Sequence, residues 1–213
     1  MKMIDYRNTE FCKKMTKISR KKKKLLTLLQ KEHPRGKINY NIIKNYYREK
    51  FYNIYNNKCA YCGASMETLG MDRLEIDHFI HESSFGKDNI KAGNIKNLVT
   101  ACYACNRRKG SFLIENDKKF NPDFKTFKKL FYRNSNYEIK IFYKYLNDKQ
   151  VIRFYEILKL GAEFRRLDFL ILKILKLIEK LEKIEGKEEE ISDLAKLHLK
   201  LLRKRNKINP LSN

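Results

Sequence analysis

No apolar run in the chain reaches the roughly 18 residues that a membrane span needs. The first residues, MKMIDYRNTEF, lack the apolar core of a secretory signal peptide. These absences predict a cytoplasmic protein with no membrane segment, in a compartment where cysteines stay reduced. The 213 residues contain no internal repeat and are enough for one domain with extensions, or for two small domains.

Acidic residues are scarce relative to basic ones. The chain has 25 Asp and Glu against 48 Lys and Arg, a formal net charge of +23. This excess favours binding to a polyanion, most simply nucleic acid. A Lys-rich proteome is the alternative explanation, but a bias of that kind would raise Glu alongside Lys, and the excess remains.

Cysteines are few, yet four of the five form two Cys-x-x-Cys pairs, Cys59 with Cys62 and Cys102 with Cys105. Thiolates at positions i and i+3 can hold one ion, and two such pairs supply the four-sulfur pattern of structural zinc. Residues 63–101 separate the pairs, so the metal would clamp the base of a long excursion. Because four thiolates fill the coordination sphere of zinc and leave no position for a water, we expect any catalysis at another site.

Only four histidines are present, and two of them lie in the excursion, in EIDHFIHESSFG at 75–86. Asp77 and His78 are adjacent on a predicted strand, so their side chains diverge, one toward a metal and the other toward a substrate. Asn106 follows Cys105 near the start of a predicted helix. Oxygen ligands from Asp77 and Asn106 suit Mg²⁺ or Mn²⁺, and a metal-free His78 could take a proton from water. Together with a basic surface, the metal-binding oxygens and the free imidazole suggest phosphodiester hydrolysis.

Residues 59–112 resemble the HNH, or ββα-metal, endonuclease family. The residues that carry the resemblance are Cys59-Ala-Tyr-Cys62, Asp77-His78, Asn97-Leu98 and Cys102-Tyr-Ala-Cys105-Asn106-Arg-Arg-Lys109-Gly110. The step from Asn97 to Asn106 is also similar to that in the HNH domain of RNA-guided CRISPR nucleases.

The resemblance implies a role for each matching residue. Asp77 would bind the catalytic metal, His78 would activate water, and Asn97 would brace the loop and orient that histidine. Asn106 would be the second metal ligand. The implied reaction cuts DNA with one divalent ion on the scissile phosphate and leaves 5′-phosphate and 3′-hydroxyl ends.

His81 departs from the family pattern, because many relatives have proline at that position. It is either a loop residue or phosphate contact, or else a third metal ligand or proton carrier. Arg107, Arg108 and Lys109 are expected to contact the DNA backbone, with a solvated helix face as the alternative.

The expected fold class is mainly α with a small α+β centre: a ββα-metal core flanked by N-terminal helices and a C-terminal helical hairpin. We divide the chain into a basic arm and helix (1–56), a nuclease domain with structural zinc (57–125) and a helical region (126–213). The arm at 1–37 is expected to be solvated, with phosphate contact as the alternative. The predicted elements are a helix at 38–56, strands at 74–80 and 98–100, a helix from Tyr103, and helical structure after Gly110.

The last 75 residues are helical in pattern and broken at Gly186. An apolar seam recurs in steps of four and three at Leu167, Ile171, Ile174, Ile178 and Leu181. A hairpin folded on itself is the simplest solution, and a homodimer or a docked protein is the alternative. We expect residues 137–213 to be an interaction and positioning element away from the metal sites. A chain ending near residue 136 should then keep its zinc and some Mg²⁺-dependent nicking, and it would lose solubility if these helices cover the core.

Two functions of different classes fit the cysteines and the charge: a DNA endonuclease and a non-catalytic zinc-knuckle nucleic-acid-binding protein. Asp77, His78, Asn97 and Asn106 favour the enzyme, because a binding module does not need them. The resemblance further suggests a nuclease of bacterial anti-phage defence, with an ATPase or other subunit as partner. A homing or stand-alone restriction endonuclease is the alternative role.

Overall fold

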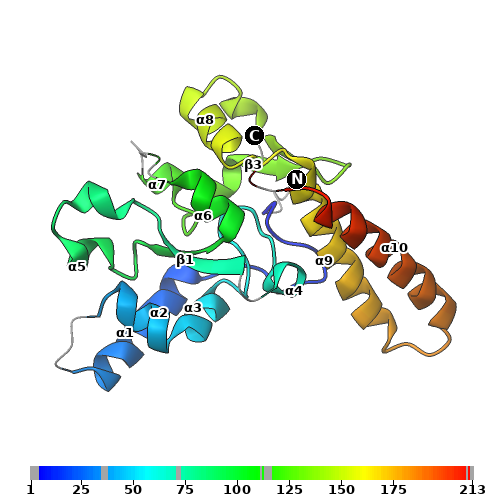
Figure 1. The fold of residues 1–213 in the computed structure, drawn as a ribbon, viewed down its shortest axis with the longest axis horizontal. Coiled ribbons are helices and arrows are strands. Elements are labelled where there is room, and N and C mark those ends of the chain that lie inside the picture. Colours follow the sequence, from blue (N-terminus) through cyan, green and yellow to red (C-terminus); the bar gives the residue numbers. More distant parts are fainter. Residues whose placement is uncertain are drawn as a thin grey trace.

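The computed structural model describes residues 5–34, 38–70, 73–110, 112, 117–209 and 211. It confirms a mainly α fold with a small α+β centre (Figure 1). The helices are α1 (Ile18–Glu32), α2 (Tyr40–Tyr46), α3 (Arg48–Ile54), α4 (Met66–Leu69), α5 (Asn89–Ala92), α6 (Tyr103–Lys109), α7 (Asp117–Phe120), α8 (Lys149–Ile157), α9 (Glu163–Leu181) and α10 (Glu188–Asn206). No helix in the described part of the chain has the length and apolar character that a membrane span needs.

A two-stranded antiparallel sheet forms the centre. Strand β1 (Leu74–His78) pairs with β2 (Leu98–Cys102), with Leu74 opposite Cys102 and His78 opposite Leu98. Every residue of β2 is buried, as expected for a short apolar run in a core. Helix α6 begins directly after β2 and contacts both strands. The two predicted strands and the helix from Tyr103 are therefore present, in a ββα arrangement.

The predicted helix at 38–56 is two helices, α2 and α3, which meet at Tyr47. The Asn39 side chain caps α2 by accepting a hydrogen bond from the Ile42 N–H. Tyr47 is buried at the junction. Of the five tyrosines between 40 and 55, Tyr47, Tyr52 and Tyr55 are buried in the core and Tyr46 is exposed.

The basic arm is solvated only in part where the structure describes it. Tyr6 and Met15 are buried, and so is Lys22 from the basic run at 20–24, whereas Arg20, Lys23 and Lys24 of that run are exposed. The Lys22 ammonium donates to the Leu98 carbonyl and forms an ion pair with Asp123, each at 2.5 Å. The prediction of a solvated arm is therefore wrong for Lys22, because this charge has a partner 101 residues away in the sequence, and it holds for the exposed bases around it.

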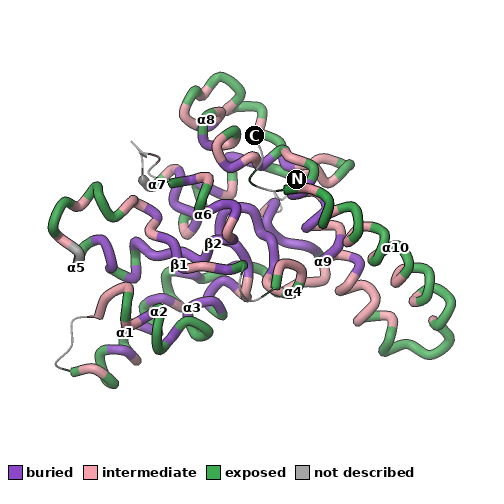
Figure 2. The backbone as a smooth tube through the Cα atoms, in the orientation of Figure 1, coloured by how far each residue is buried: buried purple, intermediate pink, exposed green. Residues whose placement is uncertain are grey.

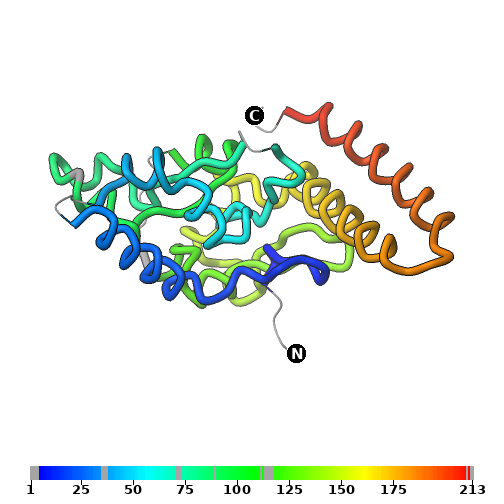
Figure 3. The backbone as a smooth tube through the Cα atoms, turned by 90° about the horizontal axis from the view of Figure 1, so that it is seen from below, coloured from blue at the N-terminus to red at the C-terminus, as the bar shows by residue number. Residues whose placement is uncertain are grey.

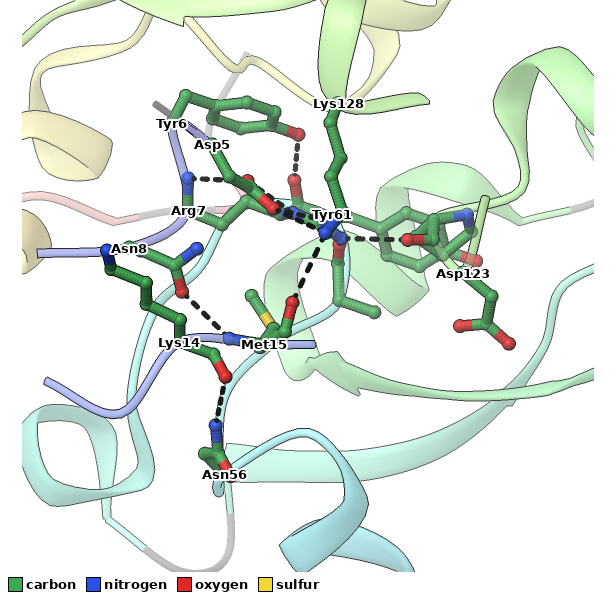
Figure 4. A network of polar contacts seen from close by, with 12 residues as sticks. Asp5, Tyr6, Arg7, Asn8, Lys14, Met15, Asn56, Tyr61, Asp123 and Lys128 are labelled. Carbon is green, nitrogen blue, oxygen red and sulfur yellow. Dashed lines mark hydrogen bonds and ion pairs between the residues drawn. The ribbon is translucent and has the colours of Figure 1, made fainter. Parts of the chain in front are cut away.

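Tyr6 and Arg7, near the start of the described chain, contact the backbone between Cys59 and Cys62, and Figure 4 shows this network around Tyr61. Asp5 holds Arg7 through two hydrogen bonds of 2.9 Å, and Arg7 donates to the carbonyls of Ala60 and Pro122. The Tyr6 hydroxyl donates to the Tyr61 carbonyl. The turn that carries Cys59 and Cys62 is thus fixed from outside by the start of the described chain.

The helical structure predicted after Gly110 is present in α7 and α8, but a hairpin of strands β3 (Phe131–Arg133) and β4 (Ile139–Ile141) lies between them. The Asn134 side chain accepts hydrogen bonds from the N–H groups of Asn136 and Glu138, which closes the turn. Tyr137 adopts a positive φ of 63° in the same turn. This local hydrogen bonding competes with a helix, and the apolar spacing alone did not reveal it.

Helices α9 and α10 form the predicted antiparallel hairpin, with Gly186 at a φ of 72° between them. The inner part of the predicted seam, Leu167, Ile171 and Ile174, is buried. The hairpin projects from one end of the molecule (Figure 3), and α10 is largely exposed (Figure 2).

Residues 137–213 contribute to the core, which is the arrangement in which a chain ending near residue 136 is expected to lose solubility. Phe154 of α8 is fully buried, and its ring lies 5.0 Å from the ring of Phe120 and 6.2 Å from that of Tyr61, between centroids. Strand β4 also supplies the partner of β3. A chain cut near residue 136 would lose core packing, while the domain boundaries themselves stay a prediction.

We expect Gly63→Ala to destabilise the protein far more than Gly186→Ala. Both glycines have a positive φ, 81° and 72°, where an L residue costs about 1–2 kcal/mol. A Cβ at position 63 would also lie 2.5 Å from the Arg7 carbonyl oxygen, whereas at 186 it meets nothing within 4 Å. In urea unfolding, the free energy of unfolding should therefore fall by about 2 kcal/mol more in Gly63→Ala than in Gly186→Ala. Equal losses would contradict the close approach at Arg7.

Candidate metal centres and active site

The four paired cysteines converge on one point. The sulfurs of Cys59, Cys62, Cys102 and Cys105 are buried and lie within 4.8 Å of one another. The Cys62 and Cys102 sulfurs are 3.8 Å apart. Zinc–sulfur bonds of about 2.3 Å in a tetrahedron place the sulfurs about 3.8 Å apart, so the residues fit Zn²⁺.

Backbone hydrogen bonds position the two pairs. The Cys59 N–H donates to the Ala64 carbonyl at 2.8 Å, and the Gly63 N–H donates to the Cys59 carbonyl at 2.9 Å, which closes the first turn. Cys102 ends β2 and stands at the N-cap of α6, which places Cys105 in the first turn of that helix.

Arg165 of α9 contacts this sulfur cluster, and sequence reasoning missed it. One guanidinium nitrogen lies 3.1 Å from the Cys62 sulfur and 3.3 Å from the Cys102 sulfur. The other terminal nitrogen donates to the Leu158 carbonyl. Burial lowers the pKa of Arg165, but the nearby sulfur charges more than offset this and raise it. A buried cation here balances the negative charge that four thiolates leave around a divalent ion.

Asp77 is buried on the face of β1 that meets α6. It accepts a hydrogen bond from the Tyr61 hydroxyl at 2.7 Å and lies 3.4 Å from the Lys109 ammonium. Burial raises the pKa of Asp77 to about 6, and Lys109 and Tyr61 oppose that rise only in part. A cation bound close to the Asp77 carboxylate would therefore stabilise its ionised form.

Asn106 lies on the same β1–α6 face, but its described contact is with Glu75. The Asn106 amide nitrogen donates to the Glu75 carboxylate at 2.6 Å. Sequence reasoning missed Glu75, although a strand places residues two apart on one face, as Glu75 and Asp77 are. Asp77, Asn106 and Glu75 offer hard oxygen donors, and the half-buried Glu75 and Asn106 leave room for water, a set that fits Mg²⁺ or Mn²⁺.

The prediction for Lys109 needs correction. Its side chain is 1% exposed, and its ammonium donates to the His78 carbonyl at 2.9 Å. A buried lysine of this kind does not reach a DNA backbone. Arg107 is 60% exposed and lies 3.9 Å from Glu75, so it remains free to meet a phosphate, and Arg108 is half-buried.

His78 occupies the opposite side of β1 from Asp77, as predicted for neighbours on a strand. Its half-buried imidazole lies 4.7 Å from the Tyr40 ring, between centroids, at an interplanar angle of 36°. Burial lowers the pKa of His78 from its ordinary value of 6.5, with a smaller opposing effect from Glu82. The ring is therefore neutral at pH 7 and can accept a proton.

Asn97 makes the contacts that bracing the loop requires. Its side-chain oxygen accepts from the Ile80 N–H at 2.9 Å, and its nitrogen donates to the carbonyls of Ile80 and Ala92. His81 starts the 3-10 turn η2 (Glu82–Phe85), where its ring accepts from the Ser83 N–H. These contacts favour the loop role for His81.

Comparison with known proteins is consistent with this geometry. Residues 59–112 match the HNH endonuclease family. The chain is 28% identical over 115 residues to the "SPbeta prophage-derived putative HNH endonuclease YoqL" of Bacillus subtilis (strain 168). The match covers 48% of this chain and 49% of that protein, so the chain spans about half the length of this curated relative. No solved structure matches the chain.

We expect about one zinc per chain by elemental analysis, and we expect Arg165→Leu to weaken zinc retention. Partners of metal ligands typically contribute about 10- to 100-fold in affinity. Competition with a chromogenic chelator should therefore release zinc faster from Arg165→Leu than from Arg166→Leu, the matched neighbour. Identical rates of zinc release from the two variants would show that Arg165 does not support the thiolates.

Cys102→Ala removes a zinc ligand, and we expect this variant to misfold.

Asp77→Asn should stabilise the protein at pH 7.5 when no divalent catalytic ion is added. Because the folded pKa is raised from 3.8 to about 6, stability falls as pH rises through that window and stays low above it. The ionised form costs about 3 kcal/mol, and we expect the amide to recover about 1–3 kcal/mol of it. Urea unfolding should show this gain at pH 7.5 and little gain near pH 4.

Asp88→Asn is the control for this change. The Asp88 side chain is 39% exposed, and hydrogen bonds from Lys91 lower its pKa, so its neutral form is not favoured in the folded protein. No stabilisation is expected at either pH. A gain at Asp88 equal to that at Asp77 would show that net charge, rather than burial, is responsible.

Proposed function

We propose that the chain, whose residues 59–112 match the HNH endonuclease family, is a metal-dependent endonuclease that hydrolyses DNA phosphodiester bonds. One observation carries the proposal: β1 presents Asp77 to α6 and His78 to the opposite side. A metal-binding acid and a free base are thereby held on adjacent residues without competing for one position. A protein that only binds nucleic acid has no use for this pair.

His78 is the proposed general base. Its neutral ring accepts a proton from the attacking water, a step that typically contributes about 10²- to 10⁴-fold to the rate. Tyr40 limits the movement of the ring, and the Lys109 ammonium holds the backbone carbonyl of the same residue. Asn97 fixes the chain that follows, so the imidazole is positioned on both sides.

Asp77 and Asn106 are the proposed ligands of the catalytic ion, Mg²⁺ or Mn²⁺. A divalent ion bound there would offset the charge that develops on the phosphate and on the departing 3′-oxygen. Glu75 accepts from the amide nitrogen of Asn106, which leaves the amide oxygen as the atom available to a metal. The net charge of +23 and the exposed Arg107 favour attraction of the DNA backbone.

The biological role is proposed at a coarser level. Bacterial defence against foreign DNA, with an ATPase or other partner docked on the α9–α10 hairpin, is the first role. A homing or stand-alone restriction enzyme is the second, and the prophage origin in the relative's name favours such a mobile-element setting. The genes that neighbour this one would discriminate the two roles.

His78→Ala should abolish cutting while DNA binding is kept. We expect the rate of Mg²⁺-dependent plasmid nicking to fall by about 10²-fold or more, because no other group replaces the base. His81→Ala is the matched control and should keep most of the activity, since that ring caps a turn. Wild-type cutting by His78→Ala would remove the assigned base, and no cutting by the unaltered protein would favour the non-catalytic alternative.

A further inference from the structure

The β3–β4 hairpin, which lies away from the proposed metal sites, carries a concave surface. With the 3-10 turn η4 (Tyr143–Tyr145), the hairpin borders a cavity of about 400 Å³. Its lining includes Tyr132, Ile141, Tyr143, Leu146 and Tyr155. This volume is near the low end of the roughly 300–1,000 Å³ found for small-ligand pockets, which suits one nucleotide unit better than a long peptide.

Aromatic exposure is concentrated at this cavity. Tyr143 is 73% exposed and Tyr132 is 37% exposed. Among the residues that the structure describes, the other exposed aromatic side chains are Tyr46 and Phe124. Two of these four therefore line one pocket, where their faces can contact a planar ligand.

The rings are held in place by neighbours. The Tyr155 hydroxyl donates to the Ile139 carbonyl at 2.7 Å, and Gly161 packs so closely on that hydroxyl that any Cβ there would collide with it. Phe142 contacts both exposed rings, edge-on to Tyr132 at 6.2 Å and tilted toward Tyr143 at 4.6 Å between centroids. A preformed aromatic surface loses little entropy when a flat group binds.

The charge around the cavity favours an anionic polymer over a neutral one. Lys140 lines the cavity, and Lys144 lies in η4 beside Tyr143. Glu138 pairs with Lys140 at 3.0 Å, so the local charge is modestly positive and adds to the net +23 of the chain. Aromatic faces with flanking basic residues are the combination that binds unpaired nucleic-acid strands.

We propose that this cavity binds an unpaired nucleobase of single-stranded DNA by stacking on Tyr143 and Tyr132. The Asn134 side chain beside it is held by its own turn, because its oxygen accepts from two turn N–H groups and its nitrogen donates to Glu138. Because stacking on ring faces tolerates any base, we expect the main preference to be for purines, which stack over a larger area than pyrimidines. The choice of DNA rests on the proposed function, whereas the stacking does not.

Fluorescence anisotropy with the full-length protein and no added Mg²⁺ tests binding apart from cutting. The probes are a labelled single strand of mixed sequence and an abasic strand of equal length, which keeps the phosphates and lacks the bases. We expect the abasic strand to bind the unaltered protein roughly tenfold more weakly or worse, since each stacked base contributes at that level.

Three variants locate the effect. Tyr143→Leu keeps an apolar side chain and loses the ring face, so it should bind the normal strand about tenfold more weakly and no longer distinguish it from the abasic one. Tyr143→Phe keeps the ring and should bind normally. Phe124→Leu, at an exposed aromatic outside the cavity, is the control and should also bind normally.

Equal binding of the normal and abasic strands by the unaltered protein would overturn the proposal, as would unchanged discrimination in Tyr143→Leu. Photocrosslinking of a 5-iodouracil strand gives a direct check, with the adduct expected on Tyr132 or Tyr143. Adducts confined to other peptides would overturn it as well. If plasmid nicking persists while single-strand binding fails, the proposed function stands and the base-binding site is rejected. If single strands bind as expected but plasmid is not nicked, the base-binding site stands and the proposed nuclease function is rejected.

Discussion

The fold depends on bringing four cysteine sulfurs together inside the protein. A zinc ion bound there would take four thiolates, which would leave the cluster negative. Arg165 supplies a positive charge beside them, and its contacts to Cys62 and Cys102 tie α9 to both cysteine pairs. The same cysteines lie at the end of β2 and the start of α6, so a metal bound to them would also hold the ββα centre.

From that centre, the alternation of a single strand separates the two halves of the proposed chemistry. Asp77 faces α6 and a buried lysine, while His78 faces an aromatic ring on α2. Lys109 bridges the halves, because its ammonium lies near the Asp77 carboxylate and donates to the His78 carbonyl. A conservative-looking change at this lysine would therefore disturb the acid and the base together, although the residue touches neither solvent nor substrate.

Short-range patterns carried most of the correct predictions. The Cys-x-x-Cys spacing, the strand that begins at Leu74, the start of α6 and the break at Gly186 each depend on neighbours within a few residues. The failures involve partners that lie far along the chain. From the sequence, Lys22 and Lys109 are expected to be surface charges, but in the fold they pair with Asp123 and Asp77, respectively. No local pattern identifies Arg165 as a partner of the cysteines. The β3–β4 hairpin failed for another reason, since Asn134 closes its turn with side-chain hydrogen bonds that apolar periodicity does not register.

The distance along the chain between the cysteines and Arg165 also imposes an order of assembly. Arg165 follows Cys102 by 63 residues, and the last cysteine comes three residues after Cys102. From Cys105, at about 5–20 residues per second, translation takes roughly 3–12 seconds to reach Arg165. A growing chain thus has all four cysteines before their charge partner exists. Metal capture can therefore precede the docking of α9, and during the interval the thiols are open to oxidants and to competing metals.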